Sequence, residues 1–228
     1  MNRIIKAIVY KNKLLHLFAK KIQRFRIKYS NPIQGKNNII INNGILENVK
    51  YDIVGDNNLI EIMQGSVLSD MLFFMRGNNH KFIIGENCNF KGGSVCFEDN
   101  HCKIEVGQKT SFESVHLAVT EPNKSILIGE DCMFSYGIEF RTGDSHSIID
   151  NITKRRINMA QDIYVGNHVW IGARSIILKG VSIGNNSIIG TNSIVTKDVP
   201  SHSIVAGVPA KVIRNNIDWV RERIYDKI

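Results

Sequence analysis

The chain has 228 residues and a formal net charge of +8, which taken alone would suggest a nucleic-acid partner. Residues 1–46 carry ten of the 29 basic residues and no acidic residue, which leaves 19 basic against 21 acidic residues in the rest. Because that main body is close to neutral and holds no nucleic-acid-reading motif, nucleic acid is excluded as the expected partner. The four cysteines form no C-x-x-C pair and nothing requires disulfides, so we expect a cytoplasmic protein.

Residues 1–30 form a basic arm with an apolar stripe at spacings of three, four or seven residues, which predicts an amphipathic helix. The stripe consists of Ile4, Ile8, Leu15, Phe18, Ile22 and Phe25. A cationic amphipathic helix can lie on an anionic membrane, which would put the protein at the inner face of the cell membrane. Packing on the following domain or on other copies of the chain explains the stripe equally well. The arm has no apolar run of about 18 residues and does not resemble a signal peptide, so it is not expected to span a bilayer.

A six-residue repeat dominates the second half of residues 31–214, which we expect to form one domain. From Val165 onward the chain reads VGNHVW IGARSI ILKGVS IGNNSI IGTNSI VTKDVP. The first position of every hexad is aliphatic, the fifth is small or β-branched, and the second is often glycine. One hexad supplies a short strand and a turn, and three hexads make one coil of a triangular tube with its aliphatic residues stacked inside. The repeat therefore predicts an all-β parallel β-helix.

Looser copies of the repeat precede it. Aliphatic–glycine pairs begin at Ile84, Val106 and Ile128, 22 residues apart, as if each coil of 18 residues carried an insertion of four. The segment 53–60 reads as an earlier coil, whereas the six-residue register breaks between about residues 61 and 82 and cannot be assigned there. Cys88 and Cys132 occupy matching places in the phrases IGENC and IGEDC, which favours small inward-facing residues over a zinc site.

The repeat breaks at about residues 142–162, a polar stretch that we expect to leave the tube as a loop. It contains His146, and Asp144 could hold a ring nitrogen of His146 or bind a substrate. Arg141, just before the loop, is a second candidate for substrate binding. A zinc site like that of the γ-class carbonic anhydrases would need two histidines five residues apart, and no two of the seven histidines have this spacing. We therefore expect no metal.

Two stretches of the chain resemble a known family. The segment from Gly166 to Arg214, which begins GNHVWIGARS, is similar to the C-terminal signature of hexapeptide-repeat O-acetyltransferases, which include the galactoside and maltose acetyltransferases. The phrase IGEDCMFSYGIEFRTGDSHSIID resembles bacterial capsule and polysialic acid O-acetyltransferases. The resemblance is strong over residues 124–214, weak over 35–123 and absent from 1–34. It implies a left-handed β-helix.

The resemblance also implies a reaction. In the family the catalytic histidine precedes the tryptophan of the VWIG phrase by 24 residues, the separation of His146 and Trp170 here. His146 would act as the general base that takes the proton of a sugar hydroxyl as the hydroxyl attacks the thioester of acetyl-CoA. Trp170 would form the wall of the acyl site opposite the histidine. The acceptor would be a glycan, a capsular or other surface polysaccharide, with sialic acid among the candidate sugars.

The resemblance also implies seven contacts to the acetyl-CoA co-substrate. The backbone of Ala173 would contact the pantetheine arm, Gly190 and Thr191 would line the same groove, and Thr196 and Lys197 would meet the nucleotide end. Lys211 and Arg214 would bind the phosphates of CoA. The resemblance further implies a homotrimer whose active sites lie between subunits, with the histidine of one subunit facing CoA held partly by another.

Two other functions remain open at this point. One is N-acyl transfer to an amino sugar or a nucleotide sugar, although no additional sugar-nucleotide domain is visible. The other is a non-catalytic β-helix scaffold held at the membrane by the arm. After the tube, the residues NNIDWVRERIYDKI at 215–228 predict a short C-terminal helix.

Overall fold

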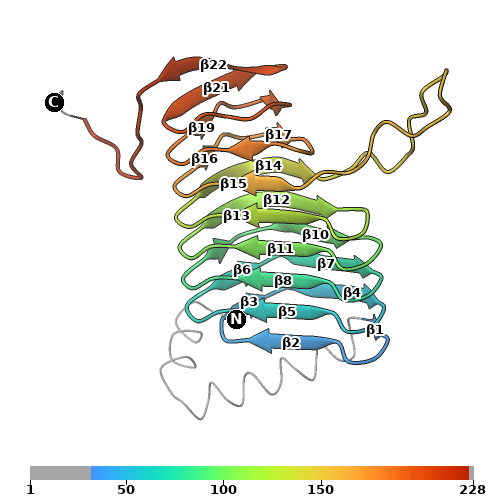
Figure 1. Cartoon of the computed structure of the whole chain (residues 1–228). Helices are drawn as coiled ribbons and strands as arrows, with labels where there is room; N and C mark the ends of the chain where they lie inside the picture. The colour runs from blue at the N-terminus through green and yellow to red at the C-terminus, as the bar shows by residue number, and fades with distance from the viewer. Residues whose placement is uncertain (1–31, 226–228) are drawn as a thin grey trace, which may run out of the picture.

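The structure is a computed structural model that describes residues 32–225, so the predicted arm at 1–30 lies outside the described residues. The chain winds into a triangular tube of stacked parallel strands (Figure 1). This confirms the predicted all-β parallel β-helix. The described part of the chain contains no helix, and therefore none long and apolar enough to cross a bilayer.

The tube has three sides. The first side is a seven-stranded parallel sheet, and the second and third sides belong to one fifteen-stranded sheet because two long strands bend around the corner between them. The first side consists of β2 (Ile39–Asn42), β5 (Leu59–Ile62), β8 (Lys81–Ile84), β11 (Lys103–Val106), β13 (Ser125–Ile128), β15 (Ile163–Val165) and β18 (Ser182–Ile183).

The second side begins with β3 (Ile45–Glu47), β6 (Val67–Ser69) and β9 (Asn89–Phe90), and continues with the first halves of β12 (Ser111–Val119) and β14 (Met133–Arg141), then β16 (Trp170–Ile171), β19 (Ile188–Ile189) and β21 (Ser203–Gly207). The third side consists of β1 (Ile33–Gln34), β4 (Lys50–Val54), β7 (Met71–Arg76), β10 (Gly93–Phe97), the second halves of β12 and β14, β17 (Ile176–Ile177) and β20 (Ile194–Val195). The last strand, β22 (Ala210–Asn215), turns back antiparallel along β21.

Three corners join these sides, and most of the candidate residues lie at or beside a corner. Corner A, at residues 166–169 and 184–187, leads from the first side to the second. Corner B, at residues 172–175 and 190–193, leads from the second side to the third. Corner C, at residues 178–181 and 196–199, leads from the third side back to the first.

The coils come in two sizes, as the sequence suggests. Lys81 pairs with Lys103 one coil later, a step of 22 residues, whereas Tyr164 pairs with Ser182, a step of 18 residues. The larger coil also covers residues 61–82, because Lys50 pairs with Leu72. Its extra residues lengthen the strands on either side of corner C, since β10 has five residues where β17 has two. The register of residues 61–82 is not visible in the sequence, because the longer strands of the 22-residue coils interrupt the six-residue spacing.

The interior follows the predicted pattern. The first and fifth positions of all six hexads are buried; they are Val165, Ile171, Ile177, Ile183, Ile189 and Val195, and Val169, Ser175, Val181, Ser187, Ser193 and Val199. Larger side chains fill the wider coils, where the ring centroids of Phe90 and Phe112 stack 3.9 Å apart. Cys88 and Cys132 are buried free thiols, as their place in the repeat indicates. Burial of such side chains coil after coil provides the main stabilisation of the tube.

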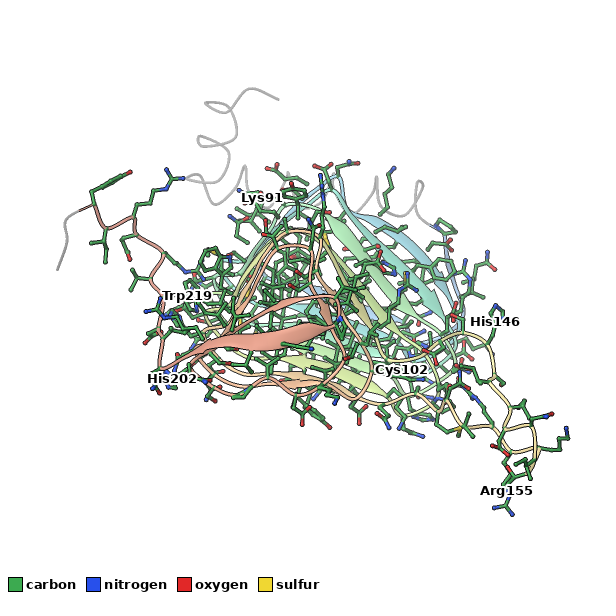
Figure 2. The ribbon with its side chains drawn as sticks, turned by 90° about the horizontal axis from the view of Figure 1, so that it is seen from above. Lys91, Cys102, His146, Arg155, His202 and Trp219 are labelled. Carbon is green, nitrogen blue, oxygen red and sulfur yellow. The ribbon has the colours of Figure 1, made fainter. Side chains whose placement is uncertain are left out.

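The predicted C-terminal helix is wrong for the residues that the structure describes. After β22, residues 216–225 form an irregular segment, here called the C-terminal strap, that descends beside corner A (Figures 1 and 2). Trp219 of the strap is 6% exposed, whereas Val220 and Ile224, on the apolar face of the predicted helix, are 55% and 59% exposed. The tertiary contacts of Trp219 therefore outweigh the local helical pattern.

Candidate active site

Residues 142–162 leave the tube at corner C and project into solvent, with Arg155 near the tip (Figures 1 and 2). Near the tip, Ile149 pairs with Arg156 in an antiparallel bridge. The carboxylate of Asp150 accepts hydrogen bonds from the backbone N–H of Thr153 and from its hydroxyl, at 2.6 and 2.8 Å. The loop is thus an ordered turn held by its own side chains.

The base of this loop is organised around Asn158, which is 7% exposed. Its side-chain amide donates to the Asp144 carboxylate and to the His146 carbonyl, both at 2.8 Å. Its side-chain oxygen accepts from the backbone N–H of Ile148 at 2.7 Å and from Arg156 at 3.2 Å. One side chain therefore ties together both strands of the loop on either side of His146.

Lys179, which follows β17, fastens this base to the tube. Its ammonium forms an ion pair with Asp144 and donates a hydrogen bond to the carbonyl of Asn158 at 3.1 Å. The hydrogen bonds from Lys179 and Asn158 hold the pKa of Asp144 below its ordinary value. Asp144 is thus an ionised anchor of the loop, and its carboxylate is engaged by these two groups.

His146 lies on this anchored base with its side chain exposed (Figure 2). Its backbone N–H donates to the carbonyl of Asp144 at 2.7 Å. Neither ring nitrogen has a hydrogen-bond partner among residues 32–225, so the imidazole is free to meet a group from outside the chain. Arg141, at the end of β14, donates to Glu139 at 2.9 Å and stays exposed beside the loop.

Trp170 lies on the second side of the tube and is 39% exposed. It is the outward residue of β16 and pairs with Met133 in the preceding coil and with Ile188 in the next. Its ring centroid lies 6.0 Å from that of Trp219 in the C-terminal strap. Figure 2 shows Trp219 and His146 on opposite sides of the tube, so one chain does not bring His146 and Trp170 together.

The strap is fixed to corner A by His168. The rings of His168 and Trp219 stack 4.0 Å apart, and the Trp219 indole N–H donates to the His168 carbonyl at 2.8 Å. The ring nitrogens of His168 contact the Asp131 carboxylate and the Trp219 carbonyl, each at 2.8 Å. Both partners are acceptors, so both hydrogen bonds form together only when the imidazole is protonated. Arg221 closes the group with a hydrogen bond to Asp131 at 3.0 Å.

The pKa of His168 follows from these contacts. Burial alone would lower it, but the Trp219 carbonyl and the Asp131 carboxylate outweigh that effect and raise the pKa above the ordinary value of 6.5. Asp131, Asp218 and Arg221 are the charged groups that face the ring. Because the folded-state pKa is raised, the stabilisation is complete below 6.5 and is lost as the pH rises through the folded-state pKa.

A substitution tests this contact. We expect His168→Asn to lower the free energy of unfolding. Asparagine tolerates the left-handed backbone of this position, so the substitution removes the ring contacts without adding backbone strain. The difference from wild type should be largest below pH 6.5 and should shrink at higher pH. Urea unfolding across a pH series measures it, and hydrogen exchange of residues 216–225 locates it in the strap. A difference that does not change with pH would contradict the protonated geometry.

The seven predicted CoA contacts divide into separate groups. Ala173, Gly190 and Thr191 stack at corner B, where the carbonyl of Ala173 accepts from the Asn192 N–H at 2.9 Å. Thr196 and Lys197 lie at corner C and are exposed. The remaining two are on β22, where Lys211 pairs with Ala206 and Arg214 pairs with Ile204.

Among residues 32–225, no three His, Cys, Asp or Glu side chains lie close enough together to hold a metal ion. Three residues with structural roles were not singled out in the sequence analysis. Asn158 and Lys179 fix the base of the loop, and Trp219 fixes the C-terminal strap to corner A. Asp144 lies 14 positions from Asn158 and 35 from Lys179 in the chain, and Trp219 lies in a segment that predicts a helix. A local pattern does not mark such contacts.

Comparison with known proteins identifies the family. A family model described as bacterial transferase hexapeptide (six repeats) matches residues 162–197. A polysialic acid O-acetyltransferase of Neisseria meningitidis is 36% identical over 192 residues, which cover 83% of this chain and 88% of that protein. The chain belongs to the hexapeptide-repeat O-acetyltransferases. It is therefore an acyltransferase, and the resemblance inferred from residues 124–214 is confirmed.

Other members of this family agree in sequence and fold. A polysialic acid O-acetyltransferase of Escherichia coli O1:K1 is 43% identical over 138 residues, which span 60% of this chain but only 44% of that longer protein. The solved structure of a polysialic-acid-specific acetyltransferase superposes with a TM-score of 0.77 at 35% identity and covers 85% of this chain and 90% of its own. A second polysialic acid O-acetyltransferase structure reaches 0.82 at 29% identity and covers 87% and 94%.

Proposed function

We propose that this acyltransferase moves an acetyl group from acetyl-CoA to a hydroxyl of a bacterial capsular or other surface polysaccharide. The observation that carries the proposal is the similarity, over most of both chains, to a polysialic acid O-acetyltransferase. His146 is the general base that takes the hydroxyl proton as the oxygen attacks the thioester carbonyl. Its exposed imidazole, free of partners within the described residues, supports this role. The thiolate of CoA then leaves, and no covalent enzyme intermediate is needed.

We further propose a homotrimer with each site between two protomers. The candidate residues fall into two groups on opposite sides of one tube, which supports this arrangement. His146, Thr196 and Lys197 belong to corner C, whereas Trp170 and the stack at corner B belong to the other group. Corner C of one protomer would meet the second side and corner B of its neighbour, and CoA would lie between them. Whether the basic arm at residues 1–30 contacts a membrane or packs on the trimer stays a prediction with two alternatives.

The reaction is tested by the release of CoA thiol from acetyl-CoA in the presence of different acceptors. The panel contains polysialic acid, neutral capsular polysaccharides and an amino sugar, which separates O-transfer from N-transfer. We expect release that depends on one polysaccharide, with acetyl esters on the product. The proposal fails if only the amino sugar is acetylated. It also fails if acetyl-CoA does not bind in a direct titration, as a scaffold would behave.

Mixed oligomers test the shared site. We expect His146→Ala and Trp170→Ala to be nearly inactive alone. When the two are refolded together, random mixing should restore about one quarter of the wild-type sites, because a site then takes its histidine from one protomer and its tryptophan from another. Sedimentation equilibrium checks that the mixture is trimeric. A site built within one chain would give no recovery.

A further inference from the structure

The strand that carries Trp170 does little to fix its indole ring. Trp170 is the outward residue of β16, which has only two residues, and it is 39% exposed. An exposed side chain on a strand has more than one staggered rotamer open to it. The residues that follow toward corner B, Gly172 and Ala173, are too small to restrict an indole. A defined orientation of Trp170 therefore needs support from another part of the chain.

Trp219 of the C-terminal strap supplies this contact from the side of corner A. The ring centroids of Trp170 and Trp219 lie 6.0 Å apart, and their planes meet at 50°. This separation is within the range of about 4.5–7 Å over which aromatic rings attract each other. Trp219 is 6% exposed, so a buried ring packs against an exposed one and limits the rotamers that the exposed ring can adopt.

Trp219 is itself fixed on several sides. Its ring stacks on that of His168 with the planes 8° apart, and hydrogen bonds run in both directions between the two residues, each at 2.8 Å. Its backbone N–H donates to the Asp218 carboxylate at 2.8 Å. The guanidinium of Arg221 lies 5.8 Å from its ring centre and donates to the carbonyl of Cys132 at 3.1 Å. These contacts join the strap to two successive coils, so the tube sets the position of Trp219.

We infer that Trp219 is a positioning residue of the acetyl transfer, whose fixed indole holds the ring of Trp170 in the orientation that the acyl site requires. The inference rests on the proposed function, in which Trp170 lines the acyl site, and adds that the strap takes part in catalysis. Trp219 needs no contact with either substrate. Both rings belong to one chain, so this support is complete within a protomer before the partner subunit's His146 approaches.

Fluorescence tests the support directly, because Trp170 and Trp219 are the only tryptophans of the chain. Trp219→Phe and Trp219→Ala both leave Trp170 as the sole tryptophan, so its emission can be compared between them. We expect the anisotropy decay of Trp170 to stay slow in Trp219→Phe, which keeps an aromatic ring between His168 and Trp170. It should gain a fast component in Trp219→Ala. Equal decays in the two variants would overturn the inference.

Transfer kinetics give the second readout. Trp219→Ala should lower kcat about tenfold, because a misplaced group in an active site is costly, while the KM for acetyl-CoA changes by less than about twofold. Trp219→Phe should recover most of the loss. A merely structural role would lower the stability of the strap and leave both constants of the folded enzyme unchanged. The matched control is Val220→Ala, the next residue of the strap, which is 55% exposed and should transfer at the wild-type rate.

A double substitution shows through which residue Trp219 acts. Trp170→Ala combined with Trp219→Ala should be no slower in single-turnover transfer than Trp170→Ala alone, because the two effects are then not additive. A further loss of about tenfold in the double variant, or wild-type kcat in Trp219→Ala, would overturn the inference and leave the proposed function intact.

Two other outcomes are decided by the same set of variants. A lack of transfer by wild type with every acceptor would remove the proposed function, and the fluorescence comparison would still decide whether Trp219 fixes Trp170. If Trp219→Ala does not fold, His168→Asn loosens the same support with both indoles in place and should lower kcat in the same direction. Wild-type kcat in that variant would then overturn the inference.

Discussion

Replacing His146 with alanine should lower kcat by about 10²–10⁴, the range that a positioned general base contributes. Acetyl-CoA should bind as before, because no predicted CoA contact lies on the loop that carries His146. The folded tube should also be unaffected, since the side chain is exposed and has no partner in the described structure. Single-turnover acetyl transfer and a direct acetyl-CoA titration measure the two effects separately.

The control for this variant is His101→Asn, another exposed histidine at corner C whose left-handed backbone asparagine tolerates. It should retain wild-type transfer. His146→Gln, which keeps a polar side chain but cannot take the proton at neutral pH, should lose as much activity as the alanine variant. Retention of more than about half of the activity by either His146 variant would show that another group is the base.

Asn158→Leu should reduce kcat by about 10², although Asn158 does not touch the substrate in the proposed site. The leucine has a similar volume but cannot form the four side-chain hydrogen bonds that fix the base of the loop. His146 would then lose its position, and a misplaced base is ineffective. The Tm should change little, because the loop lies outside the stacked core.

Hydrogen exchange distinguishes this positioning effect from general unfolding. In Asn158→Leu, the amides of residues 142–162 should exchange faster while those of β12 and β14 keep their protection. Asn151→Leu, at the exposed end of the same loop, is the matched control and should behave as wild type. Global loss of protection, or wild-type kcat in Asn158→Leu, would contradict the role of Asn158.

Several features of the molecule are readable from the chain alone. The aliphatic first position of each hexad from Val165 to Val195 predicts the stacked core, because a coil of the tube is only 18 residues long and its periodicity is local. The 24-residue separation of His146 and Trp170 matches the separation in the family that the chain resembles, and this resemblance pointed to the family. The strands within residues 61–82 could not be predicted in this way, because the longer strands of a 22-residue coil obscure the six-residue spacing.

Only the tertiary structure decided how these parts face one another. Trp219 folds onto His168 across 51 positions of the chain, and this contact replaces the helix that residues 215–228 predict. Asn158 and Lys179 meet Asp144 because the loop returns to the corner from which it left. The sequence by itself determined the tube, its core and the identity of the candidate residues, which depend on neighbours in the chain. The winding of the tube places His146 and Trp170 on opposite sides. Their separation along the chain could not show this, because it does not tell on which side of a coil each residue lies.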